Sequence, residues 1–317
     1  MKKIVSIVGL CLSVFATNAQ QEAHYTQFMH NNTLINPGFV GARRVPTFTG
    51  LYRNQWLGYK GAPASFQASF DMPIGKTRLG MGATFAHQQE GIQKRNFMNL
   101  AFNYDILHTE DATLRFGLNG TIRHYRYDVQ DPSVIIEDAT DDMVNMPNTN
   151  LYNGNIGAGV YFDNKTYYVG LSVPKLINNS IGLKQTGQVT AADDEFRHLY
   201  IQAGGFFKLN ALFHLKPALN IKITGNSPFS VDANLGVMYN RKVLVGVSYR
   251  LGNSIYGGND AAAIQTLFQV TDNLAIGAAY DFTMSEIRKV SNGSIEFLVR
   301  YDLLNGNQKI KNPRFFF

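Results

Sequence analysis

The chain has 317 residues, of which 29 are Lys or Arg and 23 are Asp or Glu, for a formal net charge of +6. These charges are spread along the chain without a basic run of about five or more, which argues against nucleic acid as the main partner. After the first residues, no segment reaches about 18 consecutive apolar residues, so the sequence predicts no transmembrane helix. A closed β-barrel is the other fold that satisfies every backbone polar group in lipid.

The first residues have the three-part layout of a secretory signal peptide. Two lysines precede an apolar run over 4–16, and a short segment then ends at Ala19. The apolar run is shorter than the roughly 20 residues that a membrane-spanning helix needs. We therefore expect residues 1–19 to direct export and to be removed, so that the mature chain begins at Gln20.

From Val45 onward, apolar residues alternate with small or polar ones, which is the period of a half-exposed β-strand. The clearest runs cover 79–85, 98–104, 114–118, 156–162, 167–173, 231–239, 243–249, 264–270, 274–282 and 295–301, and weaker candidates cover 46–57, 64–71, 196–209 and 213–223. Together they predict an all-β fold, a transmembrane outer-membrane antiparallel β-barrel of about fourteen strands over 45–303. An even strand number places both ends of the barrel in the periplasm.

The two faces of these strands differ in chemistry. One face carries aliphatic and aromatic side chains and suits lipid, and several of its runs end in an aromatic residue, as interfacial girdles do. The other face is polar or minimal and suits a lumen; its members are Gly80, Gly82, Thr84, Asn99, Asn103, Gly157, Gly159, Ser172, Asp232, Asn234, Gly236, Ser248, Arg250, Gln265 and Glu296. A soluble β-sandwich is disfavoured, because it needs far fewer strands of this length and places charge on its outer face.

Two polar stretches, 130–152 and 175–195, interrupt the alternation and are predicted to be surface loops. Their acidic residues include Glu137, Asp138, Asp141, Asp142, Asp193, Asp194 and Glu195. A Ca²⁺ site needs about six to eight oxygen ligands. Because the spacing matches no defined calcium loop, a solvated loop is favoured over a calcium site.

Two segments outside the barrel lack strand alternation. Residues 20–44 form a predicted non-barrel segment, either a plug, another lumenal segment or a periplasmic contact. Residues 304–317 form a predicted C-terminal extension.

Both ends of the chain carry short sequence motifs. They comprise a Gln-aromatic-Met element, an Asn-Pro turn that ends in glycine, a Tyr-Arg-x-Gln-Trp strand closed by Gly-Ala-Pro, and an Asn-Pro-Arg tail. The residues of these motifs are Gln27, Asn36, Pro37, Gly41, Tyr52, Arg53, Gln55, Trp56, Gly61, Ala62, Pro63, Asn312, Pro313 and Arg314. Together the motifs resemble the PorP/SprF family of type IX secretion and gliding-motility systems, and their residues are candidates for a structural or partner-binding role.

The resemblance implies a fourteen-stranded barrel in the outer membrane of Bacteroidota, in contact with membrane lipid. Such a protein would bind and anchor a large secreted adhesin through the adhesin's C-terminal sorting domain, in support of secretion or gliding motility. The alternatives are a core component of the type IX machinery, linked to periplasmic components or a peptidoglycan-binding lipoprotein, and a general diffusion porin. A porin would call for a lumen lined with charge.

The turn of the signature has a physical basis. Proline fixes φ and pushes the preceding residue to extended geometry, so Asn36-Pro37 predicts a turn. Gly41 then permits a backbone conformation that other residues resist. The signature therefore indicates structural importance without proving a function.

Arg53 is the signature residue with the clearest predicted contact. If Arg53 and Gln55 point into the lumen, Arg53 pairs with a lumenal carboxylate such as Asp232 or Glu296 and fastens the N-terminal segment. On the opposite strand face, Trp56 would then lie at an interface belt.

No linear motif for catalysis, nucleotide binding or zinc binding occurs in the chain. The histidines are scattered without ligand spacing. Outer-membrane hydrolases build catalytic sites on barrel strands without a linear motif, but we expect no enzyme activity, no cofactor and no metal here.

Overall fold

The computed structural model describes residues 24–128, 148–180, 183–185, 188–191, 194–224, 227–252 and 259–304. The predicted signal peptide 1–19 lies outside the described residues. So do Asn312, Pro313 and Arg314 of the tail and five of the acidic residues named above for the polar stretches: Glu137, Asp138, Asp141, Asp142 and Asp193.

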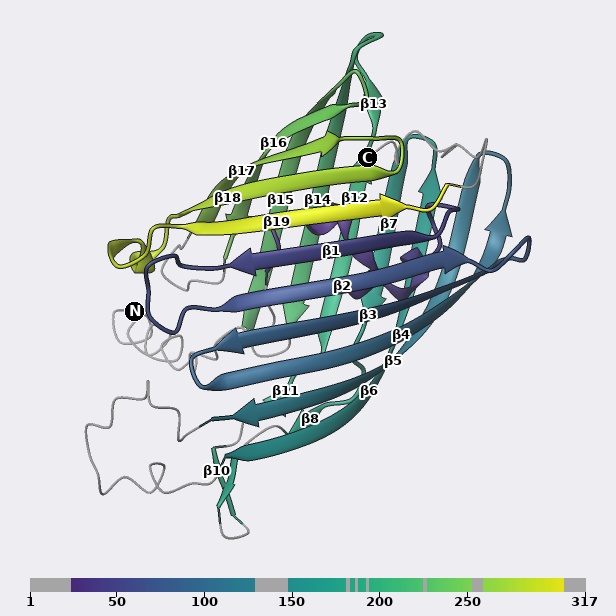
Figure 1. Ribbon diagram of the computed structural model, residues 1–317. Helices are drawn as coiled ribbons and strands as arrows, with labels where there is room; N and C mark the ends of the chain where they lie inside the picture. The colour runs from purple at the N-terminus through teal and green to yellow at the C-terminus, as the bar shows by residue number, and fades with distance from the viewer. Residues whose placement is uncertain are drawn as a thin grey trace, which may run out of the picture.

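The described residues form a closed antiparallel barrel of 14 strands (Figure 1). Its strands are β1 (Thr47–Asn54), β2 (Ala64–Pro73), β3 (Leu79–Glu90), β4 (Gln93–His108), β5 (Ala112–Tyr127), β6 (Thr149–Asn164), β7 (Tyr167–Val173), β12 (His198–Gly205) with its continuation β13 (Phe207–Lys208), β14 (Phe213–Thr224), β15 (Ser227–Tyr239), β16 (Val243–Leu251), β17 (Asn259–Gln269), β18 (Leu274–Thr283) and β19 (Ser294–Asp302). The barrel closes where β1 pairs with β19 and where β12 pairs with both β7 and β14. The predicted fold class is confirmed.

The alternation of the two faces appears directly in the exposure of β4. Met98 is 63% exposed and faces outward, whereas its neighbour Asn99 is 5% exposed and faces the lumen. The outward side chains of the barrel are mostly aliphatic or aromatic, which is what contact with lipid requires.

The hydrogen-bond ladder along β14 is interrupted between β12 and β13, and the interruption has a local cause. Phe206 separates β12 from β13, although the register with β14 is the same on both sides of the break. Pro217 of β14 lies opposite this break, and proline cannot donate a ladder hydrogen bond. The side chain of Phe206 is buried.

The two ends of the barrel carry different connections. The longer ones lie at the left end in Figure 1 and include 55–63, 174–197 and 284–293. The turns at the other end are short, and the chain enters and leaves the barrel there, before β1 and after β19. Short turns face the periplasm in outer-membrane barrels, so we call this the periplasmic end and the opposite one the extracellular end.

Smaller elements accompany the barrel. The connection between β7 and β12 contains β8 (Asn179–Ser180), β9 (Leu183–Gln185), β10 (Gln188–Ala191) and β11 (Asp194–Glu195), paired as β9 with β10 and β8 with β11. The short 3-10 helices are η1 (Phe28–His30), η2 (Asn32–Leu34), η3 (Pro37–Phe39) and η5 (Glu286–Lys289). No helix in the described ranges has the length and apolar character to cross a bilayer.

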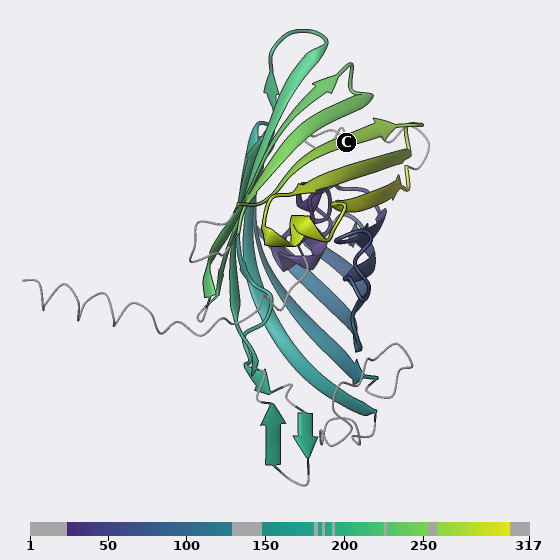
Figure 2. The ribbon, with the colours of Figure 1, turned by 90° about the vertical axis from the view of Figure 1, so that its left-hand side faces the viewer.

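The N-terminal segment lies inside the barrel. Residues 24–46, which include η1, η2 and η3, occupy the space between the wall around β1 to β4 and the opposite wall around β12, β14 and β15 (Figure 2). Most of their side chains are buried. We call residues 24–46 the plug.

Candidate functional site

The signature turn of the plug rests against glycines of the wall. Asn36 accepts a hydrogen bond at Oδ1 from the Gly38 amide (2.8 Å) and donates from Nδ2 to the Val160 carbonyl of β6 (3.0 Å). A Cβ added to Gly117 of β5 would overlap the backbone of the turn, and one added to Gly159 of β6 would overlap Asn36. The minimal inward face is therefore the surface on which the plug lies.

This contact predicts a position-specific effect along β5. Gly117→Leu places a side chain where the plug backbone lies, and overpacking of this kind costs about 1–3 kcal/mol or more. We expect the variant to lose the plugged state and most of its resistance to heat in detergent, measured as the temperature at which the folded band disappears on a gel. Gly120→Leu is the matched control, because a Cβ at Gly120 meets no atom within 4 Å. Equal loss in both variants would contradict the close contact.

Gly41 sets the turn that leads from the plug towards β1. Its φ of +69° belongs to the left-handed region, and a Cβ there would lie 2.9 Å from the Met72 carbonyl oxygen. Its amide donates to Oδ2 of Asp71 in β2 (2.8 Å). The glycine of the signature is thus required by backbone conformation and by close approach to the wall.

Arg53 fastens the first residues of the plug at the extracellular side of the lumen. Its guanidinium donates to Asp281 Oδ2 (2.6 Å), to Glu296 Oε2 (3.2 Å) and to Thr26 Oγ1 (3.3 Å). Glu296 is fully buried and also accepts from the amides of Thr26 (2.9 Å) and Gln27 (2.8 Å). Of the two partners predicted for Arg53, Glu296 is the one that it contacts.

The other predicted partner, Asp232, belongs to an adjacent pair. It accepts from Arg250 Nε at 2.6 Å and lies 3.8 Å from His24 of the plug. Arg250 also lies 3.5 Å from Asp281, so the two groups of charges are continuous. Burial, followed by the charge of Lys222, lowers the pKa of His24 to about 4, and the ring is neutral at neutral pH.

Glu195 is not the solvated loop residue that the sequence predicts. It is 1% exposed and lies against the inward-facing side chains of the neighbouring strands. Its carboxylate contacts Arg123 (2.6 Å), Lys175 (3.2 Å) and the Tyr125 hydroxyl (3.2 Å). The prediction was wrong for this residue because the end of the β7–β12 connection folds inward. The described residues contain no group of three or more His, Cys, Asp or Glu side chains placed to hold a metal ion.

Further ion pairs hold the plug at the periplasmic end. Arg43 donates to both oxygens of Asp302 in β19 (3.0 and 2.7 Å), and Arg44 donates to Asp105 of β4 (2.7 Å). Arg115 of β5 joins the same network through Asp105 (3.1 Å). These residues were not among the predicted site residues, although the alternation of β19 already places Asp302 on the lumenal face.

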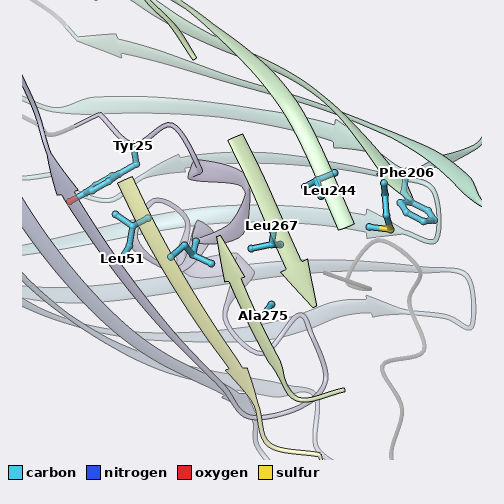
Figure 3. Close-up of a cluster of buried hydrophobic side chains, with 8 residues drawn as sticks. Tyr25, Leu51, Phe206, Leu244, Leu267 and Ala275 are labelled. Carbon is cyan, nitrogen blue, oxygen red and sulfur yellow. The ribbon is translucent and has the colours of Figure 1, made fainter. Parts of the chain in front are cut away.

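The lumen also contains an apolar cluster that the polar-face prediction missed. The cluster includes Tyr25 of the plug with Leu51, Leu267 and Ala275 of the wall (Figure 3), and Leu298 of β19 belongs to it as well. Phe206, Met238 and Leu244 complete the cluster. The plug is therefore held by apolar burial as well as by charge, and the cavities left beside it include two of about 50 Å³ each.

The remaining signature residues surround the extracellular end of β1. The strand ends at Asn54, so the prediction that Gln55 and Trp56 continue its alternation was wrong. Trp56 adopts a φ of +52° in the following turn, where its amide donates to Ser294 Oγ (3.1 Å). The Gln55 amide donates to the Pro63 carbonyl (2.9 Å).

The other signature residues lie in three different places: on the outer face of the barrel, in the lumen and in a connection. Tyr52 points outward and is exposed on the lipid-facing side, whereas Gln27 is buried in the lumen. Gly61 and its neighbour Ala62 lie in the connection between β1 and β2, and the Gly61 carbonyl accepts from the Gly91 amide (2.9 Å). The structure thus brings the plug residues and Arg53 together but leaves Tyr52 apart from them.

A family model for the type IX secretion system membrane protein PorP/SprF matches residues 17–301. The chain belongs to this family. The resemblance that the terminal motifs carry is thereby confirmed, and so is the association with type IX secretion. None of the curated proteins matches the chain.

Solved structures support the same fold. The barrel is similar to the Ralstonia pickettii toluene transporter TbuX (TM-score 0.51, 10% identity, 86% of this chain and 92% of that chain). It is also similar to a Pseudomonas aeruginosa FadL homologue (TM-score 0.50, 11% identity, 86% and 93%) and to the CymD monoaromatic hydrocarbon channel (TM-score 0.50, 11% identity, 90% and 94%). At these identities the likeness establishes the fold alone. Family and fold together identify an outer-membrane β-barrel of type IX secretion.

Proposed function

We propose that this barrel is a non-enzymatic anchor, which binds a type IX-secreted surface protein at the extracellular end through that protein's C-terminal domain. The plug supports this proposal over the alternative of a general porin. A barrel whose lumen is filled by its own N-terminal segment, held by buried hydrogen bonds at the extracellular end and by a buried ion pair at the periplasmic end, is poorly suited to free diffusion. This disfavours the general porin.

The β9–β10 hairpin is the element best suited to receive the partner. It forms a two-stranded sheet of its own beyond the barrel wall (Figure 2). Two strands leave two outer backbone edges, and an exposed edge is a template for strand addition by another chain. Pairing with a strand of the secreted protein's C-terminal domain would hold that protein at the cell surface.

Deletion of residues 183–191, which removes both β9 and β10, is expected to release one particular large surface protein into the medium while other type IX cargo is still exported. The measurement is mass spectrometry of the medium, together with affinity purification of the barrel from outer membranes in mild detergent. Deletion of 286–289, which removes η5 from another extracellular connection, is the control and should retain the partner.

Two outcomes would contradict the anchor. General loss of type IX export in the absence of the chain would favour the alternative role as a core component of the machinery, linked to the periplasm. Recovery of the barrel alone, with no secreted protein, would remove the support for anchoring.

A further inference from the structure

A cavity of about 50 Å³ lies between the plug and the periplasmic half of the wall. Its plug side includes His30 and Arg43, and its wall side includes Lys216 of β14 and Arg300 of β19. Three cationic side chains thus line one small space, and none of the described lining residues is a carboxylate.

Arg43 and Arg300 both approach the carboxylate of Asp302, which already accepts several hydrogen bonds. Asp302 accepts both hydrogen bonds of the Arg43 fork and a third from Thr47 Oγ1 (2.8 Å). Arg300 reaches it only through a 3.4 Å approach of Nε. The positive charge of the cavity lining is therefore only partly offset by this carboxylate.

Arg300 is the least satisfied group in this arrangement. It is 2% exposed, and neither its Nε nor its Nη2 has a hydrogen-bond partner in the structure. A buried guanidinium with unpaired donors is costly, because these donors have lost their hydration without replacement. The cavity beside it provides room for the missing acceptor.

The cationic side chains that line the cavity also act on His30, which lines it too. Burial, followed by the charges of Lys216, Arg300 and Arg43, lowers the pKa of His30 well below its usual value. The ring therefore stays neutral and adds no further positive charge.

We propose that this cavity binds a small free oxyanion of the phosphate class. The planar fork of a guanidinium matches an oxyanion with two parallel hydrogen bonds. The volume corresponds to a few water molecules, which suits inorganic phosphate and is too small for a lipid or a nucleotide. The anion would bridge Arg43 of the plug to Arg300 and Lys216 of the wall. Since it would bind only the plugged barrel, it would stabilise that state in proportion to its concentration.

The first test is thermal unfolding of the purified mature chain in detergent, with inorganic phosphate titrated against sodium chloride at constant ionic strength. The unfolding temperature of the wild type should rise with phosphate, and the apparent affinity of Arg300→Gln should fall at least tenfold. Lys165→Gln, which removes an exposed lysine from a periplasmic turn, should behave like the wild type. If Arg300→Gln does not fold, Lys216→Gln at the half-buried rim replaces it. A wild type that responds equally to phosphate and chloride overturns the proposal.

The second test locates the ion without any variant. Crystals of the wild-type protein soaked in selenate, an oxyanion similar in size to phosphate, should show an anomalous peak within hydrogen-bond distance of Arg300. Absence of that peak, or peaks on the outer surface only, would overturn the assignment.

Discussion

Removal of residues 24–40 is expected to turn a barrel that conducts little into an open pore. The plug occupies the lumen, and Asn36 and the surrounding turn lie directly on the glycine face of β5 and β6. Without these residues, a fourteen-stranded wall encloses a space wider than its own inward side chains fill. Gly41 and Arg43 are retained in this variant, because they connect the chain to β2 and β19 at the start of the barrel.

The measurement is single-channel conductance of the purified protein in planar lipid bilayers. The wild type should show rare openings, and the deletion variant should show stable ones of larger conductance. Deletion of 286–289 in the β18–β19 connection is the control, since it leaves the plug in place. Asn36→Ala provides a milder variant that keeps the chain length, and it should open intermittently because it loses the bonds to Gly38 and Val160. Steady conductance in the wild type would instead favour a diffusion channel.

The strand pattern predicted the fold and also one contact of the candidate site. Alternation alone places Arg53 and Glu296 on the lumenal face, and the closure of the barrel makes them direct partners across β1 and β19. The sequence therefore names one of the two carboxylates that Arg53 contacts, Glu296, and misses the other, Asp281. It does not separate Glu296 from Asp232, because that choice depends on which strands become neighbours when the barrel closes.

The plug was harder to predict, for a physical reason. Residues 20–44 have no helical or strand period, since the plug is built from 3-10 turns held by the wall rather than by its own pattern. Gly117 and Gly159 are consistent with either a narrow lumen or a filled one until the plug is seen to touch them. The burial of Leu51 and Leu298 was missed for the same reason, because an apolar side chain on a lumenal face has a partner only when Tyr25 is placed inside.

For Glu195 and Trp56, the local sequence pattern did not predict the observed structure. Glu195 is the last residue of β11 and Trp56 lies just beyond the end of β1, where the alternation stops and long-range contacts decide the backbone. The fold of the connection brings Glu195 to Arg123 and Lys175, and a positive φ at Trp56 ends β1 earlier than the pattern suggests. Nothing within a few residues of either position specifies these contacts.

Arg53→Ala is expected to destabilise the barrel by about 3–5 kcal/mol, because it leaves the buried Glu296 without its cation and Asp281 with only the more distant Arg250. Asp281 and Glu296 are both almost fully buried, and Arg53 bridges them. The loss is measured from urea unfolding of the protein in lipid vesicles. Lys60→Ala removes an exposed charge from the neighbouring connection and should change the free energy of unfolding by less than about 0.5 kcal/mol.

A neutral replacement of the whole group separates charge from packing. The triple variant Arg53→Met, Asp281→Asn, Glu296→Gln leaves no formal charge on these three side chains and should recover most of the stability that Arg53→Ala loses. Thr26 and Gln27 donate their amides to Glu296, and the carbonyl oxygen of the substituted amide side chain would still accept from one of them, so the plug should remain in place. If the triple variant is instead as unstable as Arg53→Ala, then the shape of the guanidinium, rather than the pairing of charges, holds the N-terminal segment in the barrel.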